Sequence, residues 1–139
     1  MKKYLGLDLG SKTLGISIST SGIIASNLET FKFEENNYDL AVNYLKELIE
    51  REAISDVVLG LPRHMNHDLG IRGEISVSFK EKLEAVTTAN IILWDERLST
   101  KEAVDVLIKG GVRREKQKKL KDELAATIIL QSYLNLINK

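Results

Sequence analysis

The residues of this sequence best suited to chemistry are acidic side chains in apolar surroundings. Asp8 interrupts an apolar run near the N-terminus, Asp95 and Glu96 end a second apolar run, and Asp122 lies on the apolar stripe of the last predicted helix. A carboxylate in such surroundings loses hydration, so it needs hydrogen-bond donors or a cation. If acids from these three places converge, they form the oxygen-rich site that Mg²⁺ or Mn²⁺ prefers. Separate roles, such as an Asp8 that accepts N–H bonds from its own turn, remain the alternative.

Asp8 belongs to a predicted β-hairpin that spans residues 4–20. The second arm alternates isoleucine and serine, which is the period-two pattern of a strand with one polar face. The turn, Gly10–Lys12, could bind a phosphate through its backbone N–H groups and the Lys12 ammonium, although the same residues suit any tight hairpin. A third antiparallel strand is predicted over 23–33.

Helices and buried strands alternate over the rest of the chain. Continuous apolar runs predict buried strands over 55–61 and 90–96, which makes Trp94 a core residue. A loop is predicted over 63–73. The helices predicted from amphipathic spacing cover 38–52, 74–86, 100–109 and about 119–137. This order predicts an α/β fold in one domain, 1–139: a mixed five-stranded sheet, with a three-strand antiparallel meander plus two parallel strands, and helices on both faces.

This architecture indicates where the acids lie. Ligands of α/β proteins gather at the carboxyl ends of parallel strands, which is where Asp95 and Glu96 stand. Side chains alternate along a strand, so only one of these two should point to the same side as Asp8. Asp122 is followed by the small residues Ala125–Ala126, which let the last helix approach the sheet closely.

Composition bounds the environment and the partners of the protein. The 139 residues include no cysteine, so disulfides, thiol nucleophiles and cysteine-bound zinc are excluded. No apolar run has the length of a signal peptide or a membrane span, and we expect a cytoplasmic protein with no membrane partner. Twenty basic and 20 acidic residues give zero formal net charge, so attraction to nucleic acid must come from local clusters.

Basic residues cluster in one region and also flank the predicted acidic site. Seven of the 20 lysines and arginines lie within 109–121, directly before Asp122. This basic segment could be a solvated linker, but its position favours a surface that delivers a nucleic-acid backbone to the acids. We expect Asp95 to pair with Arg97. The residues predicted to contact nucleic acid are Lys12, Arg63, Arg72, Arg97, Arg113, Arg114, Lys118 and Lys119.

Four sequence blocks, in this order, resemble those of one known family. The blocks are Gly6-Leu7-Asp8-Leu9-Gly10-Ser11-Lys12 with Gly15, Val58-Leu59-Gly60-Leu61-Pro62 with Met65 and Arg72, Asp95-Glu96-Arg97-Leu98-Ser99-Thr100 with Ala103, and Asp122-Glu123-Leu124-Ala125-Ala126 with Ile129-Leu130-Gln131-Ser132-Tyr133-Leu134. They are similar to the YqgF family of RuvC-like Holliday junction resolvases, which are also assigned to processing the 5′ end of precursor 16S ribosomal RNA. One block alone is a weak signal, but four in order over nearly the whole chain are specific. The resemblance implies a ribonuclease H-like version of the predicted α/β fold.

The resemblance also implies an activity and a site. Asp8, Glu96 and Asp122 match the acidic triad of the family, which implies that they are the catalytic residues and the ligands of two Mg²⁺ or Mn²⁺ ions. The implied reaction is phosphodiester hydrolysis in precursor ribosomal RNA or branched DNA, with ribosomal particles as a further partner, by a monomer or a homodimer. Thr13 and Thr20 depart from the family pattern, which affects substrate contacts more than the metal site.

Two other classes of protein are compatible with parts of the sequence. Sugar kinases and actin-like ATPases use a similar hairpin, with an Asp and several glycines, to bind nucleotide phosphates, but they need two such domains around a cleft. A non-catalytic ribosome-assembly or nucleic-acid-binding factor could keep the same fold and the same acids. An intact triad indicates capacity for catalysis, so activity has to be measured.

Overall fold

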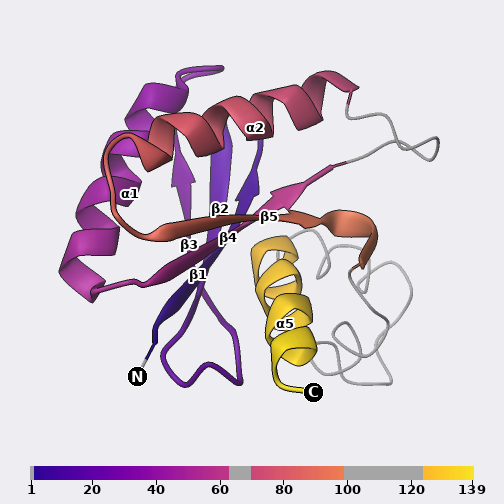
Figure 1. Cartoon of the computed structure of the whole chain (residues 1–139). Helices are drawn as coiled ribbons and strands as arrows, with labels where there is room; N and C mark the ends of the chain where they lie inside the picture. Colours follow the sequence, from indigo (N-terminus) through magenta and orange to yellow (C-terminus); the bar gives the residue numbers. More distant parts are fainter. Residues whose placement is uncertain (1, 63–69, 99–123) are drawn as a thin grey trace.

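The structure is a computed structural model that describes residues 2–62, 70–98 and 124–139. Figure 1 shows the arrangement of its strands and helices. In chain order the elements are β1 (Tyr4–Leu9), β2 (Thr13–Ser19), β3 (Ser26–Lys32), α1 (Tyr38–Glu52), β4 (Asp56–Leu61), α2 (Gly70–Glu84), β5 (Asn90–Asp95), the short 3₁₀ helix η1 (Glu96–Leu98) and α5 (Ala125–Ile137).

β1 is the central strand of a five-stranded sheet with the order β3-β2-β1-β4-β5. It pairs antiparallel with β2 along its whole length and parallel with β4 as far as the pair Leu7–Leu59. β3 is antiparallel to β2 at one edge, and β5 is parallel to β4 at the other. This topology confirms the predicted meander followed by two parallel strands. It also places Asp8 in the centre of the sheet.

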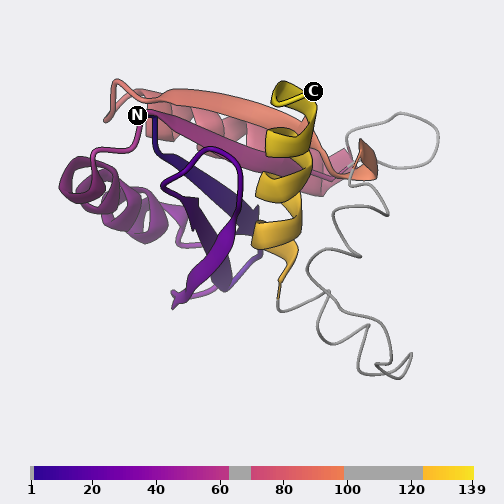
Figure 2. The same cartoon turned by 90° about the horizontal axis from the view of Figure 1, so that it is seen from below.

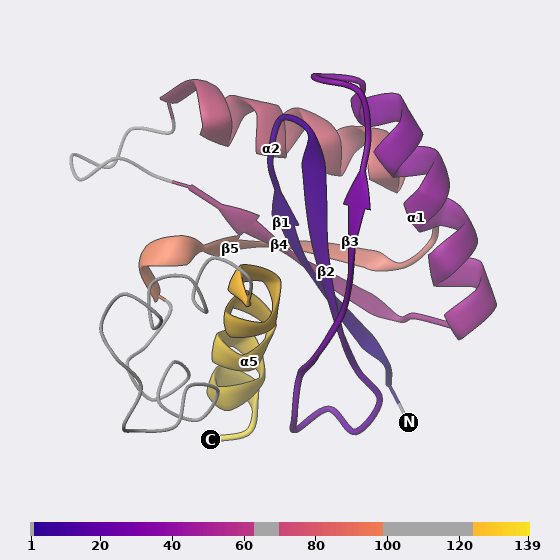
Figure 3. The ribbon, with the colours of Figure 1, turned by 180° about the vertical axis from the view of Figure 1, so that it is seen from behind.

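Helices cover both faces of the sheet, as Figures 1 and 2 show. α1 and α2 pack on one face, where Leu5, Leu7 and Leu9 of β1 belong to a buried apolar cluster. α5 crosses the other face, over a second cluster that includes Tyr4. Figure 3, the view from behind, shows α5 on the side of the sheet away from α2. Because side chains alternate along a strand, Asp8 shares the α5 face with Tyr4.

Small residues let α5 lie close to the sheet. A Cβ atom added at Gly6 would lie 2.7 Å from the carbonyl oxygen of Ala126 and 2.6 Å from the Cβ atom of Leu130. The Ser17 hydroxyl donates a hydrogen bond of 2.8 Å to the same Ala126 carbonyl, which ties the first turn of α5 to β2. These contacts confirm the predicted close approach of the last helix.

The helix boundaries differ in part from the prediction. α2 begins at Gly70, so that the last part of the predicted loop over 63–73 is helical. Glycines at 70 and 73 weaken the local helix signal, but Gly73 is buried, and tertiary packing overrides a weak propensity. The predicted helix over 100–109 lies outside the described residues, as does the predicted start of the last helix. In the structure α5 begins at Ala125.

The α5 face also buries the single tryptophan. Trp94 is 8% exposed, and its ring meets Tyr133 edge to face at a centroid distance of 5.6 Å. This burial confirms the prediction that Trp94 is a core residue. Over the described ranges, no helix is both long and apolar enough to cross a membrane.

Candidate active site

Asp8, Gly60 and Glu96 stand at the carboxyl ends of three neighbouring strands. Asp8 and Gly60 are the penultimate residues of β1 and β4, and Glu96 directly follows β5. The register of β1 on β4, continued by one residue, places Asp8 beside Gly60, and Gly60 in turn pairs with Trp94 of β5. Neighbouring strands are about 4.8 Å apart, so β1 and β5 are separated by about 10 Å. Acidic side chains from these two strands can therefore approach each other over β4.

Gly60 leaves open the space that the Glu96 side chain occupies. A Cβ atom at Gly60 would lie 2.8 Å from the Glu96 Oε1 atom and 2.5 Å from the Ile129 Cδ1 atom of α5. Real Cβ atoms do not come this close to other heavy atoms, so any larger residue would displace one of these neighbours. The contact with Ile129 also shows that the Glu96 carboxylate lies on the α5 face, which is the face of Asp8.

The position of Glu96 beside Asp8 changes the pKa of its carboxyl group. Partial burial, together with the negative charges of Asp8 and Asp95, raises the pKa of Glu96 to about 7. Like charges at short range disfavour the ionised form of a carboxyl group. Glu96 and Asp8 are thus close enough to interact electrostatically, and a cation between them would relieve the repulsion.

Asp95 forms an ion pair with Arg97. The Asp95 Oδ2 atom lies 2.6 Å from Nη2 of Arg97, and Nε of Arg97 lies 3.1 Å from both carboxylate oxygens. The Arg97 backbone N–H also donates to Oδ1, at 2.9 Å. The hydrogen bonds with Asp95 raise the pKa of Arg97. These contacts confirm the predicted pair and hold an exposed guanidinium next to Glu96.

Lys12 and Arg72 are the other two residues within the described ranges that were predicted to contact nucleic acid, and their surroundings differ. Lys12 is exposed in the turn between β1 and β2. Arg72, from the first turn of α2, donates a hydrogen bond of 2.9 Å to the Leu9 carbonyl oxygen and one of 3.4 Å to the Tyr38 hydroxyl oxygen. Lys12 is therefore available at the surface, whereas Arg72 is engaged within the protein.

Several predicted site residues lie outside the described residues. Among the acids, this applies to Asp122. The same applies to these predicted nucleic-acid contacts: Arg63, Arg113, Arg114, Lys118 and Lys119. Within the described ranges, no group of three His, Cys, Asp or Glu side chains could hold a metal ion. The site as described therefore provides two neighbouring carboxylates, Asp8 and Glu96, with Asp95 at its border.

The first turn of α5 lies beside Asp8. A Cβ atom at Gly15 of β2 would lie 3.6 Å from the Asp8 Cβ atom and 3.6 Å from the Ala126 Cβ atom, so both residues border the same small space. Ala126 is four positions after Asp122 in the sequence. The described part of α5 thus begins beside Asp8.

Sequence reasoning identified the charged residues and missed the role of Gly60. Gly60 was predicted to lie near the end of the buried strand over 55–61, before the loop beside the site, and this prediction gave it no contact with an acidic side chain. No local signal shows that a carboxylate from another strand covers this position. The contacts of Arg72 with Leu9 and Tyr38 were also missed, since they join residues far apart in the sequence.

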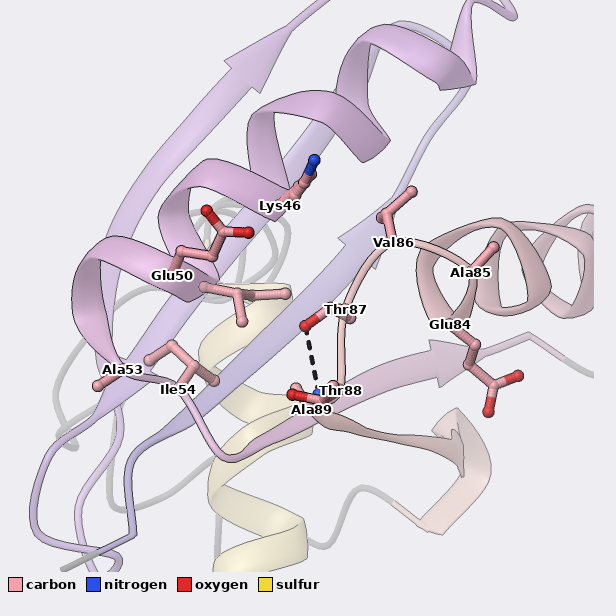
Figure 4. Close-up of a pocket in the computed structure, with 11 residues that line it drawn as sticks. Lys46, Glu50, Ala53, Ile54, Glu84, Ala85, Val86, Thr87, Thr88 and Ala89 are labelled. Atoms are coloured by element: carbon pink, nitrogen blue, oxygen red, sulfur yellow. Dashed lines mark hydrogen bonds between the residues drawn. The ribbon is translucent and has the colours of Figure 1, made fainter.

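A cavity lies at the other end of the sheet. It has a volume of about 740 Å³ and is lined by the last part of α1 and the connection between α2 and β5, including Lys46, Glu50, Ile54, Thr87 and Ala89. The dashed line in Figure 4 marks the hydrogen bond of 3.2 Å that the Ala89 backbone N–H donates to the Thr87 hydroxyl oxygen. The cavity borders the amino ends of β4 and β5, so it is separate from the carboxylate site.

Comparisons with known proteins agree with the predicted resemblance. The family model described as "RuvX: Holliday junction resolvase" matches residues 2–136. A protein of Onion yellows phytoplasma named "Putative pre-16S rRNA nuclease" is 50% identical over 134 residues, which cover 96% of this chain and 89% of the relative. A protein of the same name from Staphylococcus saprophyticus is 47% identical over 135 residues, which cover 96% of this chain and 95% of the relative.

The fold is also similar to that of solved RuvC structures. The structure of Thermus thermophilus RuvC in complex with a Holliday junction substrate has a TM-score of 0.61 and 11% sequence identity, and the match covers 99% of this chain and 96% of that chain. A second Thermus thermophilus RuvC structure also has a TM-score of 0.61. This similarity confirms the ribonuclease H-like fold class. The match to the family model and the identity with these relatives show that the chain belongs to the RuvX family, also called YqgF.

Proposed function

We propose that this protein is a metal-dependent nuclease that hydrolyses phosphodiester bonds in structured nucleic acid. The observation that carries the proposal is the pair of carboxylates, Asp8 and Glu96, whose charges interact across the side-chain-free position Gly60. Paired carboxylates at the carboxyl ends of neighbouring strands suit a hard cation and a phosphate-containing substrate.

The acidic residues of the site would bind the metal ions. Asp8, Glu96 and Asp122 would hold Mg²⁺ or Mn²⁺, for which we propose two ions. When bound, the metal would supply an activated water and stabilise the charge that develops on the phosphate. Asp8 and Glu96 are well suited to this because Asp8 lies in the central strand β1 and Glu96 directly follows β5 of the same sheet.

Basic residues would bind the nucleic-acid backbone around these carboxylates. Arg97 is oriented by Asp95 beside Glu96, and Lys12 extends from the turn that follows Asp8. Charge-assisted hydrogen bonds to phosphate fix the position of a nucleic acid without reading its sequence. The remaining proposed contacts are Arg63, Arg113, Arg114, Lys118 and Lys119.

The names of the curated relatives favour precursor ribosomal RNA over branched DNA as the substrate. The curated relatives are named as pre-16S rRNA nucleases, whereas the family description is that of a Holliday junction resolvase. We propose precursor 16S ribosomal RNA as the substrate, processed at its 5′ end in the cytoplasm on or near ribosomal particles. A four-way DNA junction is the competing substrate in the test.

The test is cleavage by the purified protein and by Asp8→Asn, which keeps the size of the side chain but removes its charge. We expect Asp8→Asn to lower the cleavage rate by at least about 100-fold under Mg²⁺ or Mn²⁺, because the lost carboxylate binds the metal. Asp39→Asn is the matched control, since Asp39 is exposed on α1 and its side chain is 76% accessible. Thermal melting would check that both variants fold.

Two outcomes would reject the proposed function. Equal cleavage by Asp8→Asn and the parent would show that the carboxylate site is not catalytic. Cleavage of neither substrate by the parent, with nucleic-acid binding retained, would indicate a non-catalytic binding factor. A preference for the DNA junction over the precursor RNA would keep the nuclease and change its substrate.

A further inference from the structure

The end of β1 is held by hydrogen bonds from outside its own hairpin. β1 loses its parallel partner after the pair Leu7–Leu59, so its last residues have β2 on one side only. The Gly10 N–H donates to the Thr13 carbonyl at 2.7 Å, which makes these two residues a hydrogen-bonded pair. Hydrogen-bonded and non-hydrogen-bonded pairs alternate in an antiparallel ladder, so the carbonyl of Leu9 points away from β2.

Arg72 satisfies this carbonyl. Leu9 is only 9% exposed, and a carbonyl group left without a donor in such a place would be destabilising. Nη2 of Arg72 donates to it at 2.9 Å, and hydrogen bonds from a charged donor are stronger than those between neutral groups. Leu9 directly follows Asp8, so Arg72 fixes the backbone next to the proposed catalytic carboxylate.

Arg72 approaches from the helix layer opposite to Asp8. It belongs to α2, which packs on the face that buries Leu9, whereas Asp8 points to the α5 face. Nη1 of Arg72 lies 3.4 Å from the Tyr38 hydroxyl oxygen, at the start of α1. The Tyr38 ring in turn packs edge to face on Phe79 of α2.

Further hydrogen bonds fix the turn between β1 and β2. The Asn36 N–H donates to the Ser11 carbonyl at 2.8 Å, and the Phe33 N–H donates to the Lys12 carbonyl at 2.9 Å. The Tyr38 hydroxyl donates to the Asn36 side chain at 3.2 Å, which links this part to Tyr38 and Arg72. The carbonyls at positions 9, 11 and 12 are thus all held by donors that come from α2 or from the segment before α1.

We propose that Arg72 is a positioning residue of the nuclease site, which holds the end of β1 so that the Asp8 carboxylate stays directed toward Glu96. This role replaces the phosphate contact predicted from the sequence. It deepens the proposed function and rests on it for its catalytic meaning. The effect of Arg72 on the backbone can be measured independently of any activity.

The experiment compares the parent with Arg72→Gln, which removes the charge and the forked geometry but keeps a hydrogen-bond donor. Amide hydrogen exchange at Gly10, Phe33 and Asn36 reports on the turn, Mn²⁺ binding without nucleic acid reports on the carboxylates, and binding of a fluorescent precursor-rRNA fragment in EDTA reports on phosphate contacts. We expect exchange about tenfold faster at these amides. We also expect Mn²⁺ affinity about tenfold lower, as for other residues that orient metal ligands.

Nucleic-acid binding distinguishes the two roles of Arg72. A positioning residue leaves the affinity for the RNA fragment and its salt dependence unchanged in Arg72→Gln. A phosphate contact would lower the slope of log affinity against log salt by about 0.7–0.9, with Mn²⁺ affinity and amide exchange as in the parent, and would overturn the proposal. If the parent itself bound no Mn²⁺, the proposed function would fail, and the exchange data alone would still decide whether Arg72 holds the turn.

Tyr38→Phe is the matched control, because it leaves the Arg72 guanidinium in place and removes the hydroxyl group that Arg72 contacts at 3.4 Å, together with the hydrogen bond from this hydroxyl to the Asn36 side chain. It keeps the bond from Arg72 to Leu9, so we expect a smaller effect on exchange and Mn²⁺ affinity than in Arg72→Gln. If Arg72→Gln does not fold, Arg72→Lys replaces it in all three measurements. Lys keeps the charge and lacks the fork, so parent-like exchange and Mn²⁺ affinity in Arg72→Lys would overturn a role for the paired guanidinium contacts.

Discussion

Glu96 occupies a position in which its own ionisation is unfavourable. Partial burial and the neighbouring acids Asp8 and Asp95 raise the pKa of its carboxyl group to about 7, from an ordinary value of 4.5. Between about pH 4.5 and pH 7, this carboxyl group is therefore mostly protonated in the folded protein and mostly ionised in the unfolded chain. A proton and a divalent cation therefore compete for the same carboxylate, and metal binding should release protons near neutral pH.

The first residue-scale prediction concerns the pH dependence of stability without metal. Because the pKa of Glu96 is raised on folding, the free energy of unfolding should fall as the pH rises from about 4.5 to about 7, and the loss should be complete above 7. Glu96→Gln removes this titration. We expect it to be more stable than the parent by about 1–3 kcal/mol at pH 8 and equally stable at pH 4.

Urea unfolding in EDTA at pH 4, 6 and 8 measures this difference. Glu81→Gln, which makes the same change on the exposed side of α2, is the control. A stability difference between Glu96→Gln and the parent that is the same at pH 4 and pH 8 would contradict the prediction.

At the scale of the elements, the site depends on how closely α5 lies on the sheet. The helix contacts β1 and β2 through Gly6, Ser17 and Ala126, and its residue Gln131 bonds to backbone groups of the segment between β2 and β3. Gln131 accepts from the Ala25 N–H and donates to the Ile23 carbonyl, at 2.9 Å in both cases. These contacts fix α5 along its length, and its first turn lies beside Asp8.

The element-scale prediction compares two glycines under α5. In Gly6→Ala the new Cβ atom would lie 2.3–2.7 Å from atoms of Ser17, Leu130 and Ala126, one of them the backbone oxygen of Ala126, so the helix must move. We expect a loss of about 2–4 kcal/mol in the free energy of unfolding. In Gly15→Ala the nearest atoms are 3.6 Å away, which is an ordinary contact, and we expect a change below about 1 kcal/mol.

Chemical denaturation of both variants tests the comparison. Equal stabilities of Gly6→Ala and Gly15→Ala would show that α5 is not held against β1 as closely as the structure indicates.

At the scale of the whole molecule, the charge is balanced overall and uneven along the chain. The 20 basic and 20 acidic residues cancel, but seven basic residues and only one acid, Glu115, lie within 109–121. The rest of the chain has 13 basic residues against 19 acids, a composition that repels phosphate. Affinity for nucleic acid must then come from this basic segment and from the few cations near the carboxylates.

The whole-molecule prediction is that the basic segment supplies most of the affinity for nucleic acid. Replacement of Arg113, Arg114, Lys118 and Lys119 by Ala should weaken RNA binding strongly and reduce its salt dependence, since each phosphate contact adds about 0.7–0.9 to the slope of log affinity against log salt. Mn²⁺ binding should stay as in the parent, because none of these side chains is a carboxylate.

Fluorescence titration over a range of salt concentrations measures the effect. A variant with four other lysines replaced by Ala controls for the change in net charge; these are Lys32, Lys46, Lys82 and Lys139, all exposed in the structure. If both variants lost the same affinity, overall charge rather than the basic segment would account for binding.

The sequence by itself determined the order of the elements, the sheet topology and the family. Period-two alternation in the first hairpin and continuous apolar runs over 55–61 and 90–96 are local patterns, and local patterns are sufficient to predict strands. The same alternation separated Glu96 from Asp95, and the structure confirms that Asp95 pairs with Arg97. The start of α2 was missed because two glycines in its first turn hide a helix that packing stabilises.

Only the tertiary structure decided how close these residues come and which side chains hold them. Gly60 lies in the apolar run that predicts a strand over 55–61, yet its role depends on Glu96, which follows β5, and on Ile129 from α5. Arg72 has the pattern of a surface cation, yet it bonds to Leu9, 63 positions earlier in the chain. Such roles depend on contacts between segments that meet only when the sheet and its helices pack together, so no pattern within either segment contains them.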